Sequence, residues 1–428
     1  MENAATRHLP ATVSVSGQQT VGVTYWPATA GPYLWHAFDA ERIAADFARL
    51  REHRLTTVRV LLTWDAFMPS PDEVSRYRLR DLEKLLVLAA QSELSVVPVL
   101  FAQSLGDCIM LPAFAVDRNA ARRGVRVVSD GRVEPGGPRD MYSDPLMLEL
   151  AERWLEALLD AFANHPAIAA WDLGQDPATT MRPRRIAELS AWVRAMAERV
   201  HTHGDPCWLT LGAGDVFVAR GVRLGAVSPH LDALGLHVLP QTLPFGVEVT
   251  NSDAVIFAAQ LAQRLAGGST PLLLSTGVAT QKGGTDELLA ETREQEGQTV
   301  ADRRDVEPAS EEEAARYSGE LLERLSDAGV GGAMAWTWSD VRPRAWSTPP
   351  FDRFPSLARH GLLDAAGHDS PALDSWSALA ASEPAAPSGS PWPPDLDVAE
   401  YYANLPDSAR DLLSGWRRAT GVDAAILD

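Results

Sequence analysis

The residues with the clearest chemical potential stand at the end of an apolar run, 167–177, which reads A-I-A-A-W-D-L-G-Q-D-P. Gln175 and Asp176 place an amide and a carboxylate after this run, and Pro177 stops regular structure. A short apolar run bounded by turn residues is typical of a strand that is buried on both faces. Ligands bind at the carboxyl ends of such strands, so Asp176 is a candidate acid or base. Asp176-Pro177 also fits the N-cap and first residue of a helix, and the local pattern leaves both interpretations open.

Aromatic and polar residues hold the same place after the other apolar runs. The tryptophans are Trp26, Trp64, Trp336 and Trp338, and the polar residues are Arg59, Gln175, His237, Ser275, Thr276 and Asp340. Indole faces stack on the C–H faces of sugar rings, while Arg, His, Asp and Gln side chains hydrogen-bond to hydroxyl groups. The pattern therefore predicts a saccharide site, although a tryptophan at the end of a strand also fits a plain core residue.

The elements that must position these residues alternate between short strands and amphipathic helices. The expected strands are 19–25, 57–62, 95–101, 167–177, 207–211, 233–238, 271–276 and 332–337, and the expected helices are 40–53, 79–91, 144–164, 184–202, 252–266 and 312–328. This alternation implies parallel β-α-β units. About eight units, without a dinucleotide-type glycine fingerprint after the first strand, favour an α/β fold of the (β/α)8 TIM-barrel type. An open doubly wound sheet is the alternative.

Composition divides the chain into four parts. A polar lead-in covers 1–18, the barrel covers 19–380, a proline-rich linker covers 381–397 and a helical tail covers 398–428. The tail is too short for a core of its own, so we expect it to pack on the barrel as a short C-terminal extension. Two stretches lack an apolar period. We expect 102–143 to be a long, irregular loop that is either functional or disordered, and 281–305 to be an excursion on the surface.

Charge and cysteine content exclude several classes of function. The net charge of −19 argues against nucleic acid or an anionic membrane as a partner, because both attract a positive surface. Cys108 and Cys207 are too few for a disulfide scaffold or a cysteine zinc site. His201 and His203 fall on different faces of a helix, so we predict no metal and no cofactor. No signal-peptide core or membrane span is visible, which predicts a cytoplasmic protein, and the oligomeric state is open.

The order of these motifs resembles that of glycoside hydrolase family 5, the cellulase and β-mannanase type of retaining glycosidase. R-V-L-L-T-W-D-A-F-M-P resembles the segment with the site arginine, here Arg59. W-D-L-G-Q-D-P resembles W-D-L-G-N-E-P, which carries the acid/base glutamate, and L-H-V-L-P resembles H-x-Y-P, here with His237. P-L-L-L-S-T-G-V resembles the nucleophile motif P-L-L-L-x-E-F-G-V, and G-A-M-A-W-T-W-S-D resembles the motif with the site tryptophan, here Trp336. The resemblance covers nearly the whole barrel and implies a β-linked saccharide as ligand.

The catalytic pair of that family is altered in this sequence. A retaining glycosidase needs two carboxyl groups about 5–5.5 Å apart. The resemblance places Asp176 at the acid/base glutamate, one methylene shorter, and Gln175 at an asparagine. The nucleophile glutamate is replaced by Ser275 or Thr276, depending on the end from which the shortened segment is counted. Because a hydroxyl group cannot form and release a glycosyl ester, retaining hydrolysis is expected to be impaired, with Asp176 as the residual acid/base.

Several functions therefore remain open. One is a glycosidase-like enzyme that acts weakly on a β-linked saccharide, and another, which we favour, is a non-catalytic saccharide-binding or scaffold pseudoenzyme. In an inverting enzyme, Asp176 would activate a water while another residue such as Asp107 supplied the acid. Asp340 could also serve as a substitute nucleophile. Ser275, His237 and Asp176 could form a serine hydrolase triad, but nothing in the sequence resembles a nucleophile elbow.

Overall fold

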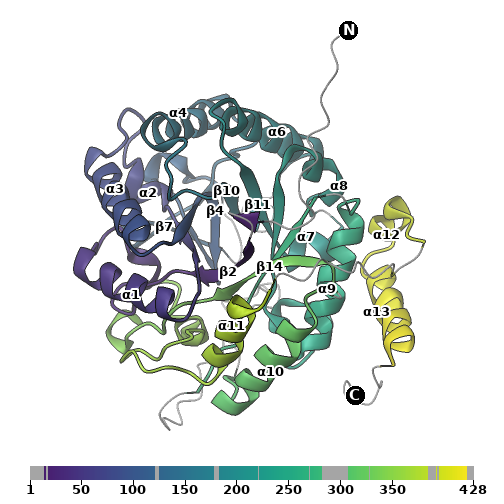
Figure 1. Ribbon diagram of the computed structural model, residues 1–428. Coiled ribbons are helices and arrows are strands. Elements are labelled where there is room, and N and C mark those ends of the chain that lie inside the picture. The colour runs from purple at the N-terminus through teal and green to yellow at the C-terminus, as the bar shows by residue number, and fades with distance from the viewer. Residues whose placement is uncertain are drawn as a thin grey trace.

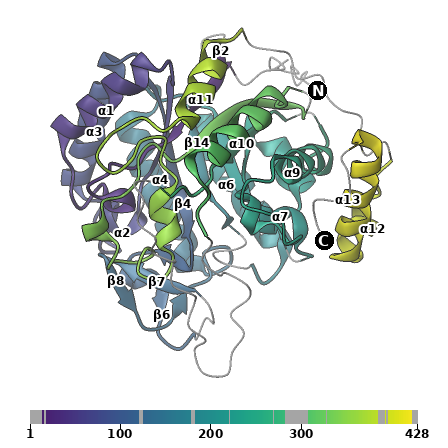
Figure 2. The ribbon, with the colours of Figure 1, turned by 90° about the horizontal axis from the view of Figure 1, so that it is seen from below.

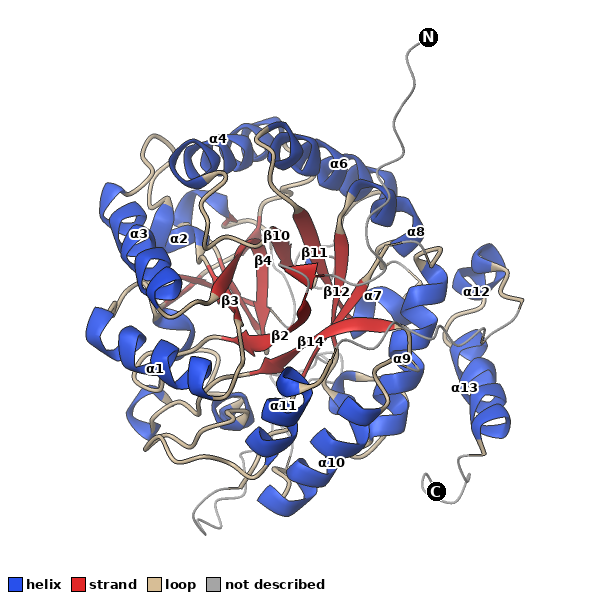
Figure 3. Ribbon diagram, in the orientation of Figure 1, coloured by secondary structure: helices blue, strands red, loops and turns tan. Residues whose placement is uncertain are grey.

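Eight of the described strands close into an all-parallel barrel inside a ring of helices (Figures 1 and 3). The computed structural model describes residues 14–421 apart from 16–17, 121–124, 178–182, 220, 269, 282–306, 327, 384–391 and 393–394. The barrel strands are β2 (Gln18–Thr24), β3 (Thr57–Leu61), β4 (Ser95–Leu105), β10 (Trp171–Gln175), β11 (Cys207–Gly212), β12 (Ala233–His237), β13 (Leu272–Thr276) and β14 (Val330–Trp336). Parallel pairing of β14 with β2 closes the ring. The (β/α)8 barrel is confirmed, and the open sheet is wrong.

The helices around the barrel begin at residues that cap them. Asp39 caps α1 (Ala40–Glu52), Asp144 caps α4 (Pro145–Phe162), and Ser310 opens α10 (Glu311–Glu323) with the expected capping box. The other long helices are α3 (Arg76–Gln91), α6 (Ile186–Thr202), α9 (Ser252–Leu265) and α11 (Ala372–Ala381). Among the described helices, none combines the length and the apolar character that crossing a bilayer requires.

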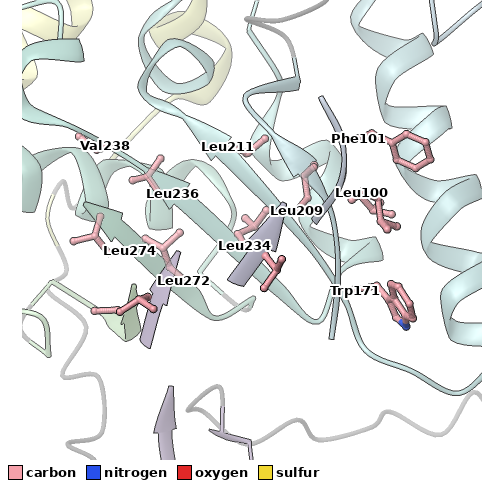
Figure 4. Close-up of a cluster of buried hydrophobic side chains, with 14 of the residues drawn as sticks. Leu100, Phe101, Trp171, Leu209, Leu211, Leu234, Leu236, Val238, Leu272 and Leu274 are labelled. Atoms are coloured by element: carbon pink, nitrogen blue, oxygen red, sulfur yellow. The ribbon is translucent and has the colours of Figure 1, made fainter. Parts of the chain in front are cut away.

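Side chains on the barrel strands alternate between the interior of the barrel and the surrounding helices. The helix-facing core includes Leu209, Leu211, Leu234, Leu236, Leu272 and Leu274 (Figure 4). A separate layer inside the barrel consists of Val97, Ala170, Trp208, Ala233, Leu273 and Met334. Because all the strands run in the same direction, the next inward-facing residues toward their carboxyl ends lie together. Those residues form the candidate site.

The described residues between β4 and α4 form short strands, so the irregular character predicted for this segment is wrong. It contains β5 (Cys108–Met110), β7 (Arg126–Ser129) and β8 (Arg132–Glu134), which extend the sheet from the end of β4. It also contains β6 (Val116–Asp117), which pairs with β9 (Gly137–Pro138). Figure 2 shows these strands beyond one end of the barrel. Strands of two to four residues are too short for an alternating pattern to reveal them.

Two short helices at the end of the chain lie against the side of the barrel. They are α12 (Val398–Ala403) and α13 (Asp407–Thr420), next to α7 (Ala213–Phe217) and α9 (Figures 1 and 2). The Tyr401 hydroxyl donates to the carbonyl of Val216 at 3.0 Å, and Trp416 Nε1 donates to Gln260 Oε1 at 2.7 Å. The segment 281–305 lies, apart from its first residue, outside the described residues.

Candidate active site

A buried ion pair between β3 and β10 forms the floor of the candidate site. Arg59 Nε donates to Asp172 Oδ2 at 2.9 Å, and Arg59 Nη1 donates to Gln175 Oε1 at 2.8 Å. Asp172 also accepts the Thr210 hydroxyl at 2.6 Å and the Thr210 backbone N–H at 3.1 Å. Arg59 is 2% exposed and Asp172 is 0% exposed. Because both charges are removed from water and paired with each other, they fix the amide of Gln175 at the end of β10.

Asp176 lies inside the barrel, above this floor. Its backbone has φ of 50°, in the left-handed region, whereas an N-cap residue is normally extended. A Cβ placed on Gly212, at the end of β11, would lie 1.4 Å from Asp176 Oδ1. Trp208 and Thr210 face the barrel interior, so the carboxylate fills the inward position that a side chain at 212 would take. This geometry favours a site carboxylate over a helix cap.

Ser275 on β13 and His237 on β12 form the adjoining wall, since His237 is in register with Gly212. They are register partners, and Ser275 Oγ lies 3.1 Å from His237 Nδ1. The Trp336 ring packs on the imidazole with 4.5 Å between ring centroids. Burial, as the largest cause, together with the electrostatic effects of Arg59 and His360, lowers the pKa of His237 to about 3. The imidazole is therefore neutral at physiological pH.

The structure resolves the uncertain nucleophile position. Thr276 faces away from the barrel interior, and its hydroxyl lies 2.7 Å from the hydroxyl of Tyr317 on α10. Neighbouring residues of a strand point to opposite faces, so only one of the two hydroxyl groups can face the site. Of the two alternatives, Ser275 is the residue that faces the site, and Thr276 faces α10.

Three further predicted site residues do not join this group. Trp64 stacks on Trp154 in the helix-facing core, with 5.6 Å between centroids and 10° between planes. Trp338 belongs to the same core. Strand β14 ends at Trp336, so the alternation of faces does not continue to position 338, and this indole turns toward the helices. Asp340 Oδ1 accepts the backbone N–H of Gly361 at 2.7 Å and so holds the loop after β14. Nothing in this arrangement supports Asp340 as a substitute nucleophile.

Trp26, which follows β2, does join the site. Its ring lies 5.0 Å from that of Trp336 at an interplanar angle of 67°. The two indoles belong to an apolar cluster that also contains residues of the β4–α4 insertion and of the loop after β14. Its other members are Leu61, Val99, Leu105, Cys108, Met110, Val128, Leu239, Val341, Phe351 and Ala358. Two loops far apart in the sequence therefore meet over one side of the barrel end.

An ion cluster joins these two loops. Arg126 on β7 binds Asp107 through Nε and Nη2, both at 2.8 Å, and binds Asp352 through Nη1 at 2.6 Å and Nη2 at 2.8 Å. Arg353 Nη1 also donates to Asp107 at 3.2 Å. The carboxylate of Asp107 is thus committed to two guanidinium groups. Its geometry offers no support for a role as the second acid of an inverting mechanism.

Sequence reasoning missed the partners that hold the site in place. Asp172 and Thr210 were not predicted as site residues, although a buried arginine at position 59 requires a carboxylate nearby. The inward face of the motif W-D-L-G contains that carboxylate, so this signal was present in the sequence. Nothing in the sequence around Gly212 indicated that this residue makes room for the carboxylate of Asp176.

The described residues contain a grouping that could hold a metal ion, but it lies outside the candidate site. Glu156 and Asp160 on α4 come close to His203, the C-cap of α6. Arg199 already pairs with Glu156 at 2.6 Å. His201 lies 2.8 Å from Asp232, so the two histidines contact different groups.

Comparison with known proteins identifies the fold. No family model and no curated protein matches the sequence. A GH5_18 variant from Streptomyces cattleya in complex with Manβ1-4GlcNAc is similar in structure, with a TM-score of 0.66, 17% identity and coverage of 86% of this chain and 82% of that one. An exo-β-1,4-mannosidase from Opitutaceae bacterium strain TAV5 has a TM-score of 0.64, 19% identity and coverage of 86% and 60%. An endo-β-1,4-mannanase from Thermotoga petrophila has a TM-score of 0.57, 15% identity and coverage of 86% and 77%. This chain therefore has the (β/α)8 barrel fold of glycoside hydrolase family 5 structures.

Proposed function

We propose that this protein binds a β-linked saccharide at the carboxyl end of its barrel and does not hydrolyse it by double displacement. One observation carries the proposal. The Asp176 carboxylate fills the inward position of Gly212 on β11, and at the same level two strands further on, the inward position of β13 holds Ser275, whose hydroxyl lies 3.1 Å from the neutral His237. A covalent glycosyl intermediate requires a carboxylate at that place.

Three other described carboxylates that the sequence or the structure places near the site have structural roles. Asp172 pairs with Arg59, Asp107 pairs with two guanidinium groups, and Asp340 accepts a backbone N–H. None of them has the geometry of a second catalytic group facing Asp176. A protein that keeps the sugar-binding groups without the catalytic pair is best described as a saccharide-binding pseudoenzyme.

The residues that remain suit a sugar ring. Trp26 and Trp336 are indoles of the type that stacks on sugar rings, packed on each other and 1% and 2% exposed, while Gln175 and His237 are polar groups at the ends of β10 and β12, on either side of β11. The class of sugar is suggested by the similar structures, which include a GH5_18 variant in complex with Manβ1-4GlcNAc, an exo-β-1,4-mannosidase and an endo-β-1,4-mannanase. We therefore propose a β-mannoside as the ligand.

Titration calorimetry with Manβ1-4GlcNAc and β-1,4-mannobiose tests the proposal, with turnover measured on the same samples. We expect binding without hydrolysis, and we expect Trp336→Ala to abolish the binding. Tyr77→Ala is the matched control, because Tyr77 is 76% exposed on α3. Absence of binding to any β-linked oligosaccharide would refute the proposal. Hydrolysis that Asp176→Ala abolishes would show instead an active glycosidase, and the anomeric form of the product would identify a retaining or inverting mechanism.

A further inference from the structure

The side chains of the candidate site are almost completely covered in this structure. The indoles of Trp26 and Trp336 are 1% and 2% exposed. The polar side chains of Gln175, Ser275 and His237 are 2%, 4% and 8% exposed. Side chains that line a saccharide pocket must be accessible before the sugar arrives, since the bound sugar is what then covers them. The site is therefore closed, and a sugar can stack on these indoles only after a covering segment moves.

One of the covering segments is the chain that follows β14, residues 342–358, here called the β14 loop. Its two ends meet, because the Val341 N–H donates to the carbonyl of Ala358 at 2.8 Å. Between these ends, Phe351 is 1% exposed and its ring lies 6.1 Å from that of Trp26, at an interplanar angle of 80°. Phe351 thus covers aromatic surface of Trp26 that a sugar ring needs.

The β14 loop is built so that it can move as a unit. Its backbone hydrogen bonds are local, as in the bond from the Asp352 N–H to the Thr348 carbonyl at 3.1 Å and that from the Phe354 N–H to the Pro350 carbonyl at 3.0 Å. The β4–α4 insertion, in contrast, is joined to the barrel by a ladder that runs from β4 through β5 to β7. A compact loop with adjoining ends and local hydrogen bonds keeps its own structure when it swings on those ends.

An ion pair ties the β14 loop to the insertion. The Asp352 carboxylate accepts from Arg126 Nη1 at 2.6 Å and from Nη2 at 2.8 Å, and the two side chains are 29% and 13% exposed. Arg126 also binds Asp107 through Nε and Nη2. Release of Asp352 therefore leaves the guanidinium paired with Asp107 and moves the freed carboxylate into water, so that opening strands no buried charge.

We propose that the β14 loop is a lid which opens to admit the saccharide, and that the pair of Asp352 with Arg126 is its latch. This inference rests on the proposed saccharide site and names what controls entry to it. In the closed form Phe351 covers Trp26, and in the open form the sugar takes its place. The apparent affinity is then the intrinsic affinity multiplied by the fraction of open molecules. A weaker latch should raise the affinity for saccharide, whereas a substitution that merely damages the site lowers it.

Asp352→Asn tests the latch, because it removes the charge and keeps the size of the side chain. We expect its Kd for Manβ1-4GlcNAc, measured by titration calorimetry, to fall about 10-fold or more, since hydrogen bonds to charged groups are the strong ones. Amide hydrogen exchange over 343–357 should speed up about 10-fold without any saccharide, while that of β13 stays unchanged. The control is Asp253→Asn, since Asp253 is 30% exposed and pairs with Arg324 at 2.5 Å. It should change neither measurement.

Phe351→Ala provides a second test of the same sign, which also serves if Asp352→Asn does not fold. It uncovers Trp26 directly and should likewise lower the Kd. Saccharide binding by the parent protein that both variants leave unchanged or weaken would overturn the lid and leave the proposed function intact. Unchanged hydrogen exchange over 343–357 in Asp352→Asn would also overturn the lid. Absence of saccharide binding in the parent protein and in both variants would overturn the lid and the proposed function together, whereas binding by the variants alone would support both.

Discussion

Removal of the Asp172 carboxylate should destabilise the barrel strongly, because it leaves Arg59 buried without its counter-ion. Arg59 Nε and Nη2 both lie 2.9 Å from Asp172 Oδ2, and the two side chains are 2% and 0% exposed. Loss of one partner of a buried pair costs about 3–5 kcal/mol. The Thr210 hydroxyl and backbone N–H lose their acceptor as well. We therefore expect Asp172→Ala to lower the free energy of unfolding by about 4 kcal/mol, a large part of the about 5–15 kcal/mol of an ordinary protein.

Urea unfolding at pH 7, followed by tryptophan fluorescence and circular dichroism, measures this loss. The control removes both charges at once, as Arg59→Met with Asp172→Leu. Replacement of a buried pair by apolar residues is often close to neutral, so the double variant should be more stable than either single variant. The same double variant should bind saccharide poorly, because Gln175 loses the guanidinium that holds its amide. A loss below 1 kcal/mol in Asp172→Ala, or a double variant whose loss equals the sum of the single losses, would refute the reasoning.

Three other substitutions test separate parts of the structure by the same unfolding assay. Gly212→Ala should lower the free energy of unfolding by about 1–3 kcal/mol, because its Cβ would lie 1.4 Å from Asp176 Oδ1. Addition of Asp176→Gly to the same chain should restore most of that stability. If stability is not restored, the placement of Asp176 is contradicted. His237, with a pKa of about 3 when folded and about 6.5 when unfolded, should make the fold less stable as the pH falls below 6.5, by about 2 kcal/mol at pH 5. Burial raises the pKa of Asp215 to about 6, so this group makes the fold more stable as the pH falls and opposes the effect of His237. The quantity to measure is therefore the difference in the free energy of unfolding between the parent protein and His237→Gln as a function of pH. A difference that does not change between pH 7 and 5 would contradict the buried, neutral imidazole. Gly319→Ala, inside α10, should raise the free energy of unfolding by about 0.5–1 kcal/mol, because the added Cβ would lie 3.7 Å from the nearest atom, Ser375 Oγ. A lower free energy of unfolding would show that the space around position 319 is tighter than the structure indicates.

Much of the fold could be predicted because its signals are local. Apolar runs bounded by turn residues gave the positions of the barrel strands, and the capping residues Asp39, Asp144 and Ser310 marked the helix starts. The expected helix 252–266 matches the start of α9, where Asn251 is the N-cap and accepts the Ala254 N–H. Ser and Asn are both good N-caps, so the sequence alone could not choose between adjacent candidates.

The candidate site was predicted less completely, because it depends on which way each side chain points. Arg59, Gln175, His237, Trp26 and Trp336 come together as the order of motifs implied. Other aromatic residues with the same position relative to a strand, such as those at 64 and 338, face the helices instead. A position at the end of a strand does not specify a face once the chain leaves the regular pleat.

The parallel barrel, the acid at position 176 after β10 and the hydroxyl residues 275 and 276 at the end of β13 could all be predicted from short stretches of sequence. Only the tertiary structure decided that Ser275 and not Thr276 faces His237, and that Arg59 pairs with Asp172 across 113 residues of chain. It also decided that the insertion and the loop after β14 meet through Arg126. These contacts join strands and loops that are distant in the chain, so they exist only after the ring of strands has closed and fixed the register and the face of every residue.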